Sequence, residues 1–237
     1  MKKVFIGGDS WGCGEWTHEA SIAHKGVETY FNEVGYNVVN SSAGKVSNFM
    51  SIDRLQESLK EKYSEADLIF WFKTDTIRDL HHNNYYTLTN ELKKFGNFKG
   101  LINFLSDNSY NNLNQLAVRH NTKIYLIGGY GSLIPDLLEK YDNLVPLVPS
   151  VVDLLVGHHE KYSAITKNFQ GTTNWGINHI NLKEYDLSVA GEIIIELSNM
   201  CAAKDNIFQE KIFWSDGHHP NRHGHRILFD YIMKKLN

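Results

Sequence analysis

The sequence has 237 residues, of which 42% are hydrophobic and 22% are charged, and its formal net charge is −3. This composition is near the globular average and excludes disorder for most of the chain, and the length fits a single domain covering residues 1–237. The charge balance provides no electrostatic footprint for nucleic acid, and no apolar run reaches the roughly 18 to 20 residues of a membrane span.

Strands and helices alternate along the chain. Short apolar or β-branched runs predict four strands, at 3–6, 36–39, 68–72 and 123–127. Apolar residues at helical spacing predict helices at 22–34, 47–63, 101–120, 182–203 and 222–236, and a short extended piece is expected at 212–214. This alternation predicts an α/β fold with a mainly parallel sheet of about five strands and helices on both faces. The least periodic stretch contains a predicted lid or substrate loop at about 157–180.

The beginning of the sequence and its cysteine content bear on the expected compartment. Three apolar residues, Val4 to Ile6, precede the first glycine, whereas a secretory signal needs about 7 to 15 apolar residues. We therefore expect a cytoplasmic protein. The two cysteines, Cys13 and Cys201, are too few for a disulfide framework or a cysteine-built zinc site. No cofactor and no metal are expected, and the sequence does not indicate an oligomeric state.

The segments that follow the strands contain the candidate site residues, because ligands of open α/β sheets bind at the carboxyl ends of the strands. Ser10 follows the first strand and is the candidate nucleophile. A serine hydroxyl needs a base, and His219 precedes the last helix with Asp216 three residues before it. In this arrangement Asp216 would hold the imidazole N–H and stabilise the imidazolium that forms when His219 takes the proton of Ser10.

Each of these features also has a plainer interpretation. A serine between a strand and a helix is more often a helix cap than a nucleophile. The Asp-x-x-His spacing occurs a second time, at 79–82, so the spacing alone decides nothing. The position of Asp216 and His219 directly before the final helix is what favours the catalytic interpretation.

Taken together, Gly8-Asp9-Ser10 and Asp216-Gly217-His218-His219-Pro220-Asn221 resemble the SGNH (GDSL) hydrolase family, in their order and in their position at the two ends of the chain. The resemblance implies a three-layer flavodoxin-like fold and hydrolysis of an ester through an acyl-serine intermediate. It implies catalytic roles for Ser10, Asp216 and His219, and an oxyanion hole that includes the backbone N–H groups of Ser10 and Gly44. The expected substrate is a small-molecule or saccharide ester, with carbohydrate O-acyl esters among the candidates.

The third block of the family, Gly-x-Asn-Asp, does not match cleanly. The corresponding stretch, 72–79, has neither the glycine nor the asparagine, and Asp75 lies nearest the asparagine position, with Thr76 as the alternative. An ionised Asp75 would repel an oxyanion, and loss of one oxyanion donor typically costs about 100- to 1,000-fold in turnover. The alternative function is therefore a catalytically weak or inactive SGNH-fold binding protein. Substrate contacts are expected from three further side chains: Trp11, Arg78 and Trp175.

Overall fold

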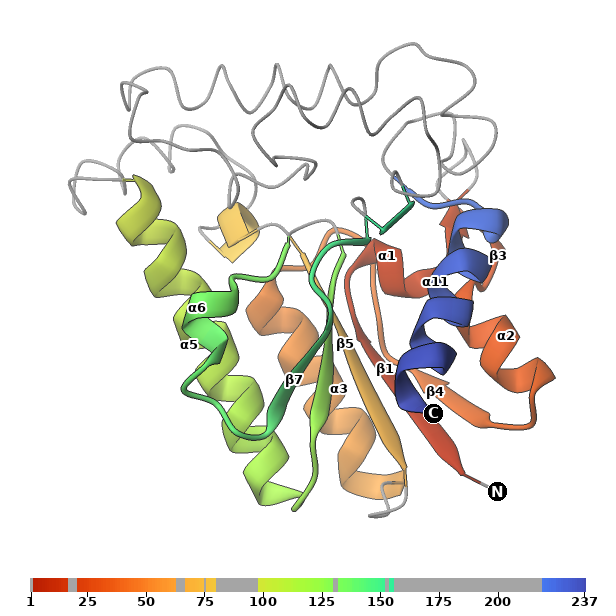
Figure 1. Ribbon diagram of the computed structural model, residues 1–237, viewed down its shortest axis with the longest axis horizontal. Coiled ribbons are helices and arrows are strands. Elements are labelled where there is room, and N and C mark those ends of the chain that lie inside the picture. Colours follow the sequence, from red (N-terminus) through yellow and green to blue (C-terminus); the bar gives the residue numbers. More distant parts are fainter. Residues whose placement is uncertain are drawn as a thin grey trace, which may run out of the picture.

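A five-stranded parallel sheet forms the centre of the protein (Figure 1). The computed structural model describes residues 2–16, 21–62, 67–74, 76–79, 98–129, 132–151, 154–155 and 219–237. The strands are β1 (Lys3–Gly8), β4 (Asn37–Asn40), β5 (Leu68–Lys73), β6 (Ile124–Gly128) and β7 (Leu144–Val148). Their order in the sheet is β4-β1-β5-β6-β7. This is the flavodoxin-like order, in which the second strand lies outside the first, and it confirms the predicted fold class.

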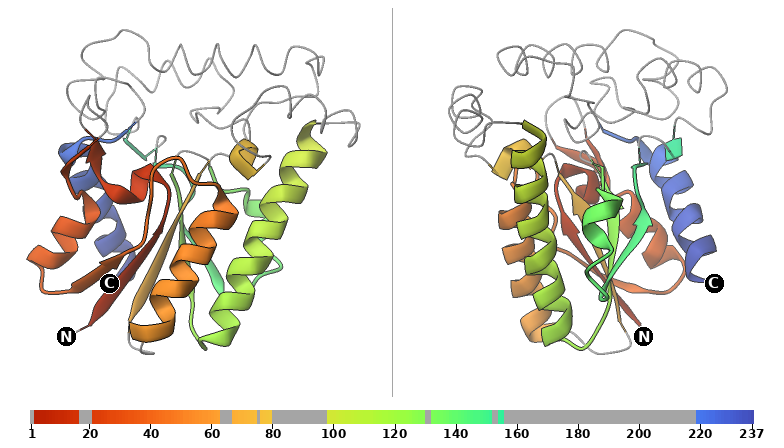
Figure 2. Two further views of the ribbon diagram at one scale, coloured as in Figure 1. Left: turned by 180° about the vertical axis from the view of Figure 1, so that it is seen from behind. Right: turned by 60° about the vertical axis from the view of Figure 1, so that its left-hand side comes forward.

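Helices cover both faces of this sheet (Figure 2). On one face lie α3 (Asn48–Lys62), α5 (Phe98–Arg119) and the short α6 (Pro135–Leu138). On the other face lie α2 (Val27–Glu33) and α11 (Arg222–Leu236). The strand order reverses between β1 and β5, so the crevice that such folds use for ligands opens at the carboxyl ends of these two strands.

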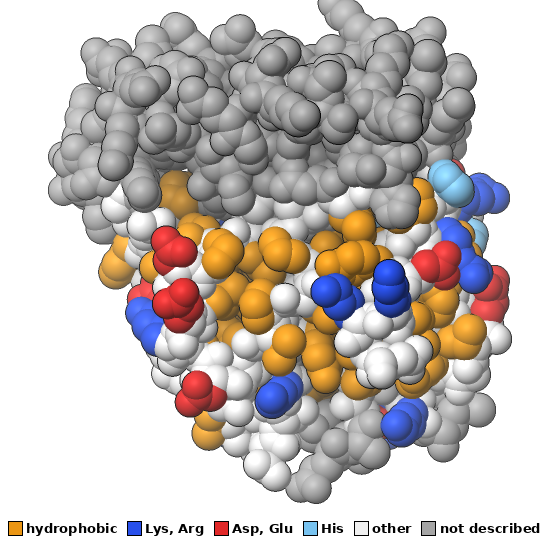
Figure 3. Space-filling view, viewed as in Figure 1, with side chains coloured by type: hydrophobic (Ala, Val, Ile, Leu, Met, Phe, Trp, Pro, Cys, Tyr) orange, Lys and Arg blue, Asp and Glu red, His pale blue; other side chains and the backbone are white. Residues whose placement is uncertain are grey.

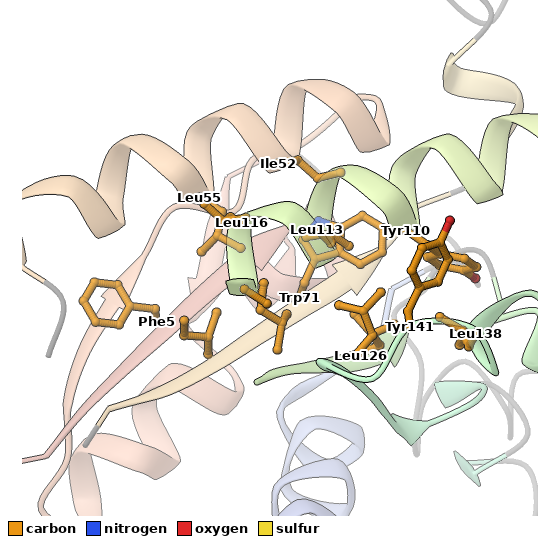
Figure 4. Close-up of a cluster of buried hydrophobic side chains, with 14 of the residues drawn as sticks. Phe5, Ile52, Leu55, Trp71, Tyr110, Leu113, Leu116, Leu126, Leu138 and Tyr141 are labelled. Carbon is orange, nitrogen blue, oxygen red and sulfur yellow. The ribbon is translucent and has the colours of Figure 1, made fainter. Parts of the chain in front are cut away.

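The buried side chains of each strand alternate between two hydrophobic cores, because successive residues of a strand point to opposite faces. From β1, Val4 and Ile6 join the core beneath α2 and α11, whereas Phe5 joins the core beneath α3 and α5. The side chains of β5 alternate in the same way, with Phe72 in the core beneath α2 and α11 and Trp71 in the core beneath α3 and α5. Figure 4 shows the second core, in which side chains of α3 and α5 meet those of the strands. A strand buried on both faces explains the continuous apolar run at 68–72.

One predicted element differs from the observed one, and one strand of the five-stranded sheet was not predicted. The helix predicted at 22–34 is wrong at its start, because Ile22–His24 forms a strand, β3, which pairs antiparallel with β2 (Glu15–Trp16). The helix α2 begins only at Val27, and Gly35 follows it at a φ of 88°, as expected for a residue that ends a helix. The strand β7 was not predicted. The predicted elements at 182–203 and 212–214 and the loop at 157–180 lie outside the described residues.

Two features of the described residues bear on the partners of this protein. No helix in the described part of the chain is long and apolar enough to cross a membrane. In the described part of the face shown in Figure 3, acidic and basic side chains are scattered among hydrophobic ones. That scatter agrees with the balanced charge of the sequence.

His225 is buried where α11 packs beside α2. Its ring is 1% exposed and lies so close to Gly26 that a Cβ atom on that residue would stand 2.7 Å from the imidazole. The pKa of His225 is lowered from its ordinary value of 6.5 to about 4, chiefly by burial. The charges of His24 and His219 contribute to this shift, and the backbone of Gly14 opposes it. The folded protein therefore resists the protonation of this imidazole.

Acid should consequently destabilise the fold through His225. Between pH 6.5 and pH 4 the unfolded chain binds a proton that the folded chain does not, so stability is lost as the pH falls through this range. Going from pH 7.5 to pH 5, the free energy of unfolding should fall about 2 kcal/mol further in the wild type than in His225→Gln. Urea unfolding at the two pH values measures this difference. His223→Gln, on the exposed side of the same helix, is the control and should behave as the wild type. An equal loss in the wild type and in His225→Gln would contradict the prediction.

Candidate active site

Ser10 lies at the carboxyl end of β1, as the first residue of the short helix α1 (Ser10–Cys13). The residue that caps this helix is Asp9, whose Oδ1 accepts a hydrogen bond of 3.0 Å from the N–H of Trp11. The carbonyl oxygen of Asp9 also accepts the N–H of Gly12 at 3.1 Å. Because Asp9 supplies the cap, the capping interpretation of the Ser10 hydroxyl is wrong. That hydroxyl is instead placed at the crevice between β1 and β5.

The imidazole of His219 lies against this hydroxyl. Its Nε2 is 2.9 Å from the Oγ of Ser10, although the two residues are 209 positions apart in the sequence. His219 stands just before α11, where Asn221 caps the helix by accepting the N–H of Gly224 at 3.0 Å. With Nε2 toward the serine, Nδ1 is the atom that a carboxylate partner would contact. The predicted partner, Asp216, lies outside the described residues.

The turn that contains Gly44 packs beside the segment that contains Ser10. The N–H of Ala43 donates to the carbonyl oxygen of Gly8 at 3.1 Å, and the side-chain amide of Asn40 donates to the carbonyl oxygen of Gly12 at 2.9 Å. The two segments approach so closely that a Cβ atom at Gly12 would collide with the hydroxyl of Ser42. Gly44 therefore belongs to the loop next to Ser10, and its role as an oxyanion donor stays a prediction.

The segment after β5 is held by a buried lysine. Lys73 is 0% exposed, and its Nζ donates to the hydroxyl of Thr76 at 2.7 Å. The same hydroxyl lies 3.1 Å from the hydroxyl of Ser106, on α5. These contacts hold the Thr76 hydroxyl inside the protein, which does not favour it as the alternative oxyanion donor. Asp75, the first choice for that position, lies outside the described residues.

A second set of hydrogen bonds attaches the start of α3 to the same segment. Asp79 accepts the backbone N–H of Asn48 at 2.7 Å and its side-chain amide at 2.8 Å. The side-chain oxygen of Asn48 in turn accepts the N–H of Thr74 at 3.0 Å. Burial raises the pKa of Asp79, and its hydrogen bonds from Asn48 oppose that shift. The sequence did not reveal this link, because its partners lie far apart in the chain and match no motif.

Asp9, the residue before Ser10, is also fully buried. Desolvation raises the pKa of Asp9, while the positive charge of Arg78, the nearby Thr74 side chain and the hydrogen bond from the backbone of Trp11 lower it. The charge of Arg78 therefore acts on the residue adjacent to Ser10. Its predicted contact with substrate stays a prediction.

Of the two tryptophans predicted to contact substrate, one is placed by the structure. Trp11 is 1% exposed and belongs to the core beneath α2 and α11, which does not favour a contact with substrate. The side chain turns inward because α1 directs it toward the sheet instead of the crevice. Trp175 lies outside the described residues. In the described part of the chain, no three His, Cys, Asp or Glu side chains gather in a way that would hold a metal ion.

Comparison with known proteins gives matches among solved structures alone. No protein-family model matches the sequence, and no curated protein matches it significantly. A lipase/acylhydrolase from Enterococcus faecalis is 14% identical, with a TM-score of 0.41 over 100% of this chain and 95% of that one. The structure of TesA is 13% identical, with a TM-score of 0.41 over 100% and 98%. LAE5, an alpha/beta hydrolase from the metagenome of Lake Arreo in Spain, is 14% identical, with a TM-score of 0.41 over 99% and 94%. Likeness at this level carries no argument about activity.

Proposed function

We propose that this protein is a serine hydrolase of the SGNH (GDSL) type that cleaves a carboxylic ester through an acyl-Ser10 intermediate. The observation that carries the proposal is the distance of 2.9 Å between the Ser10 Oγ and the His219 Nε2. A serine with an imidazole at hydrogen-bond distance is the arrangement that converts a weakly reactive hydroxyl into a nucleophile. The position of the pair at the switch point of the sheet supports the same conclusion.

The proposed reaction has two halves. In the first, the Ser10 Oγ attacks the ester carbonyl carbon while His219 takes the hydroxyl proton, and the resulting oxyanion is bound by the N–H groups of Ser10 and Gly44. The tetrahedral species collapses, and the alcohol leaves with the proton that His219 returns. In the second half, His219 takes a proton from water, whose oxygen attacks the acyl-serine. The carboxylic acid leaves and Ser10 recovers its proton. Asp216 is proposed to orient the imidazole throughout.

The proposed substrate is an ester of a small molecule or a saccharide, with carbohydrate O-acyl esters as the finer proposal. We further propose that residues 1–237 form one SGNH-hydrolase-like domain, in which 157–180 serves as a lid or substrate loop. A screen of acetylated sugars and of aryl esters separates the two substrate groups.

Covalent labelling tests the proposed nucleophile directly. A fluorophosphonate probe should react with the wild-type protein, and peptide mapping should place the adduct on Ser10, because the neighbouring His219 activates that hydroxyl. Ser10→Ala should not be labelled. Ser58→Ala, which removes a hydroxyl bonded within α3, is the matched control and should react as the wild type does. Absence of labelling in the wild type would favour the inactive binding protein instead, and labelling that persists in Ser10→Ala would mean that another residue is the nucleophile.

A further inference from the structure

The indole of Trp16 contacts three parts of the proposed catalytic machinery. Its Nε1–H donates to the carbonyl oxygen of Ser10 at 2.8 Å. Its ring lies beside that of His219, with the ring centroids 5.7 Å apart and the planes inclined by 40°. The far edge of the indole lies above Gly44, where a Cβ atom would stand 2.9 Å from its Cη2. One side chain therefore adjoins the proposed nucleophile, the proposed base and the proposed oxyanion donor.

Trp16 is itself held in place by the hairpin of β2 and β3. It pairs with Ile22 across this hairpin. The neighbouring Glu15 is 6% exposed, and its Oε2 accepts a hydrogen bond of 2.8 Å from the Nε of Arg222. Arg222 is the first residue of α11, three positions after His219. The ion pair therefore fixes the hairpin to the same helix that the histidine precedes.

We propose that Trp16 is a positioning residue for His219 and sets the size of the acyl pocket, so that this site prefers esters of short acyl chains. The inference rests on the proposed hydrolase function. It concerns how the imidazole is aligned and which acyl groups fit, and neither follows from the presence of a serine and a histidine.

The alignment of the imidazole follows from the contact between the two rings. A ring beside His219 limits rotation of the imidazole away from the Ser10 Oγ, and the hydrogen bond to the Ser10 carbonyl fixes the backbone that carries the nucleophile. A displacement of about 1 Å between reacting groups can cost about 100-fold in rate. Loss of the indole should therefore lower kcat with little change in KM.

The selection of the acyl group follows from the contact with Gly44. The oxyanion of the bound ester lies at the Gly44 N–H in the proposed mechanism, so the acyl chain begins beside the same residue. The edge of the indole borders the space next to Gly44, because a Cβ atom there would stand 2.9 Å from its Cη2. In the proposal this edge admits an acetyl group and excludes longer chains. A smaller residue at position 16 opens that space.

Rates of hydrolysis of p-nitrophenyl esters of different acyl length test both parts of the proposal, the alignment of His219 and the selection of the acyl group. We expect Trp16→Ala to lower kcat for p-nitrophenyl acetate roughly 10- to 100-fold with a similar KM. The ratio of kcat/KM for p-nitrophenyl octanoate to that for acetate should rise by about 10-fold or more, since pocket contacts with methylene groups discriminate on this scale. Trp16→Phe keeps a ring beside His219 and should retain most of kcat for acetate, with a smaller rise in the ratio. Trp16→Phe also tests the proposal if Trp16→Ala does not fold.

Ile22→Ala is the matched control, because it weakens the same hairpin at the position opposite Trp16 and leaves the indole in place. It should lower the melting temperature and leave the octanoate-to-acetate ratio unchanged. An active wild type whose ratio is the same in both Trp16 variants overturns this inference and leaves the hydrolase standing. A wild type that neither hydrolyses these esters nor is labelled at Ser10 overturns the hydrolase, and this inference with it.

Discussion

Ser10→Ala and His219→Ala are each expected to lower kcat for ester hydrolysis by roughly 10⁴- to 10⁶-fold, the loss found when a serine or its histidine is removed from such a pair. Without the Oγ no acyl-enzyme forms, and without the imidazole the hydroxyl keeps its proton at neutral pH. Hydrolysis of p-nitrophenyl acetate by purified variants measures the loss. His223→Ala, an exposed histidine four positions beyond His219, should retain the full rate.

The effects of the two substitutions on kcat should also not be additive. Because Ser10 and His219 act as one unit across their 2.9 Å contact, the double variant should be about as slow as either single one. Asp216→Asn should be milder than both, since it changes the group proposed to orient the base and leaves the base itself. Full activity in His219→Ala would exclude the proposed mechanism, whereas full additivity would show that the serine and the histidine act separately.

Gly8→Ala is expected to destabilise the fold by about 3 kcal/mol or more. Gly8 has a φ of 136°, which side chains rarely tolerate, and an added Cβ would lie 2.5 Å from the Cβ and 2.6 Å from the carbonyl oxygen of Phe72. These Phe72 atoms cannot withdraw easily, because Gly8 and Phe72 are register partners in the pairing of β1 with β5. Urea unfolding gives the change in the free energy of unfolding.

Gly35→Ala separates the two causes of that loss. Gly35 also has a positive φ, 88°, but an added Cβ would meet no atom within 4 Å. Its substitution should cost only about 1 to 2 kcal/mol, the strain of a left-handed backbone. Equal losses for Gly8→Ala and Gly35→Ala would mean that the contact with Phe72 contributes nothing.

The fold was predictable where the pattern of a segment reflects its own burial. The buried run at 68–72 and the amphipathic helix at 222–236 both appear in the structure, the latter as α11 with the same ends. The strand β7 was missed because Pro146 interrupts it, and proline suits only an edge strand. Edge position depends on the strand order, which the segment itself does not show. The helix prediction wrongly included Ile22, because it rested on the spacing of apolar residues along the chain. That spacing does not reveal that Ile22 pairs with Trp16 across the hairpin.

The site was predictable to the extent that motifs mark it. Ser10 and His219 lie in the two motifs, and the structure brings them together. Trp11 and Trp16 both flank the serine, and the sequence does not distinguish them. Their places differ because α1 turns the first into the core, whereas the hairpin holds the second beside His219. The structure of the third block, residues 72–79, was the hardest part of the site to predict, because its hydrogen bonds join residues from separate helices.

The docking of α11 beside α2 has a consequence for how this protein tolerates change in length. Phe31 of α2 meets Phe229 of α11 edge to face, with centroids 5.1 Å apart, so the helix that follows His219 is held by packing against α2. The entropy of closing a long loop grows slowly, by about 0.6 kcal/mol for each doubling of its length. Insertions or deletions in loops between Ser10 and His219 should therefore leave the pair in register, provided that the sheet and α11 persist. By the same geometry, a chain interrupted before residue 219 has the proposed nucleophile and lacks the proposed base, so the proposed ester cleavage requires that the final helix has docked.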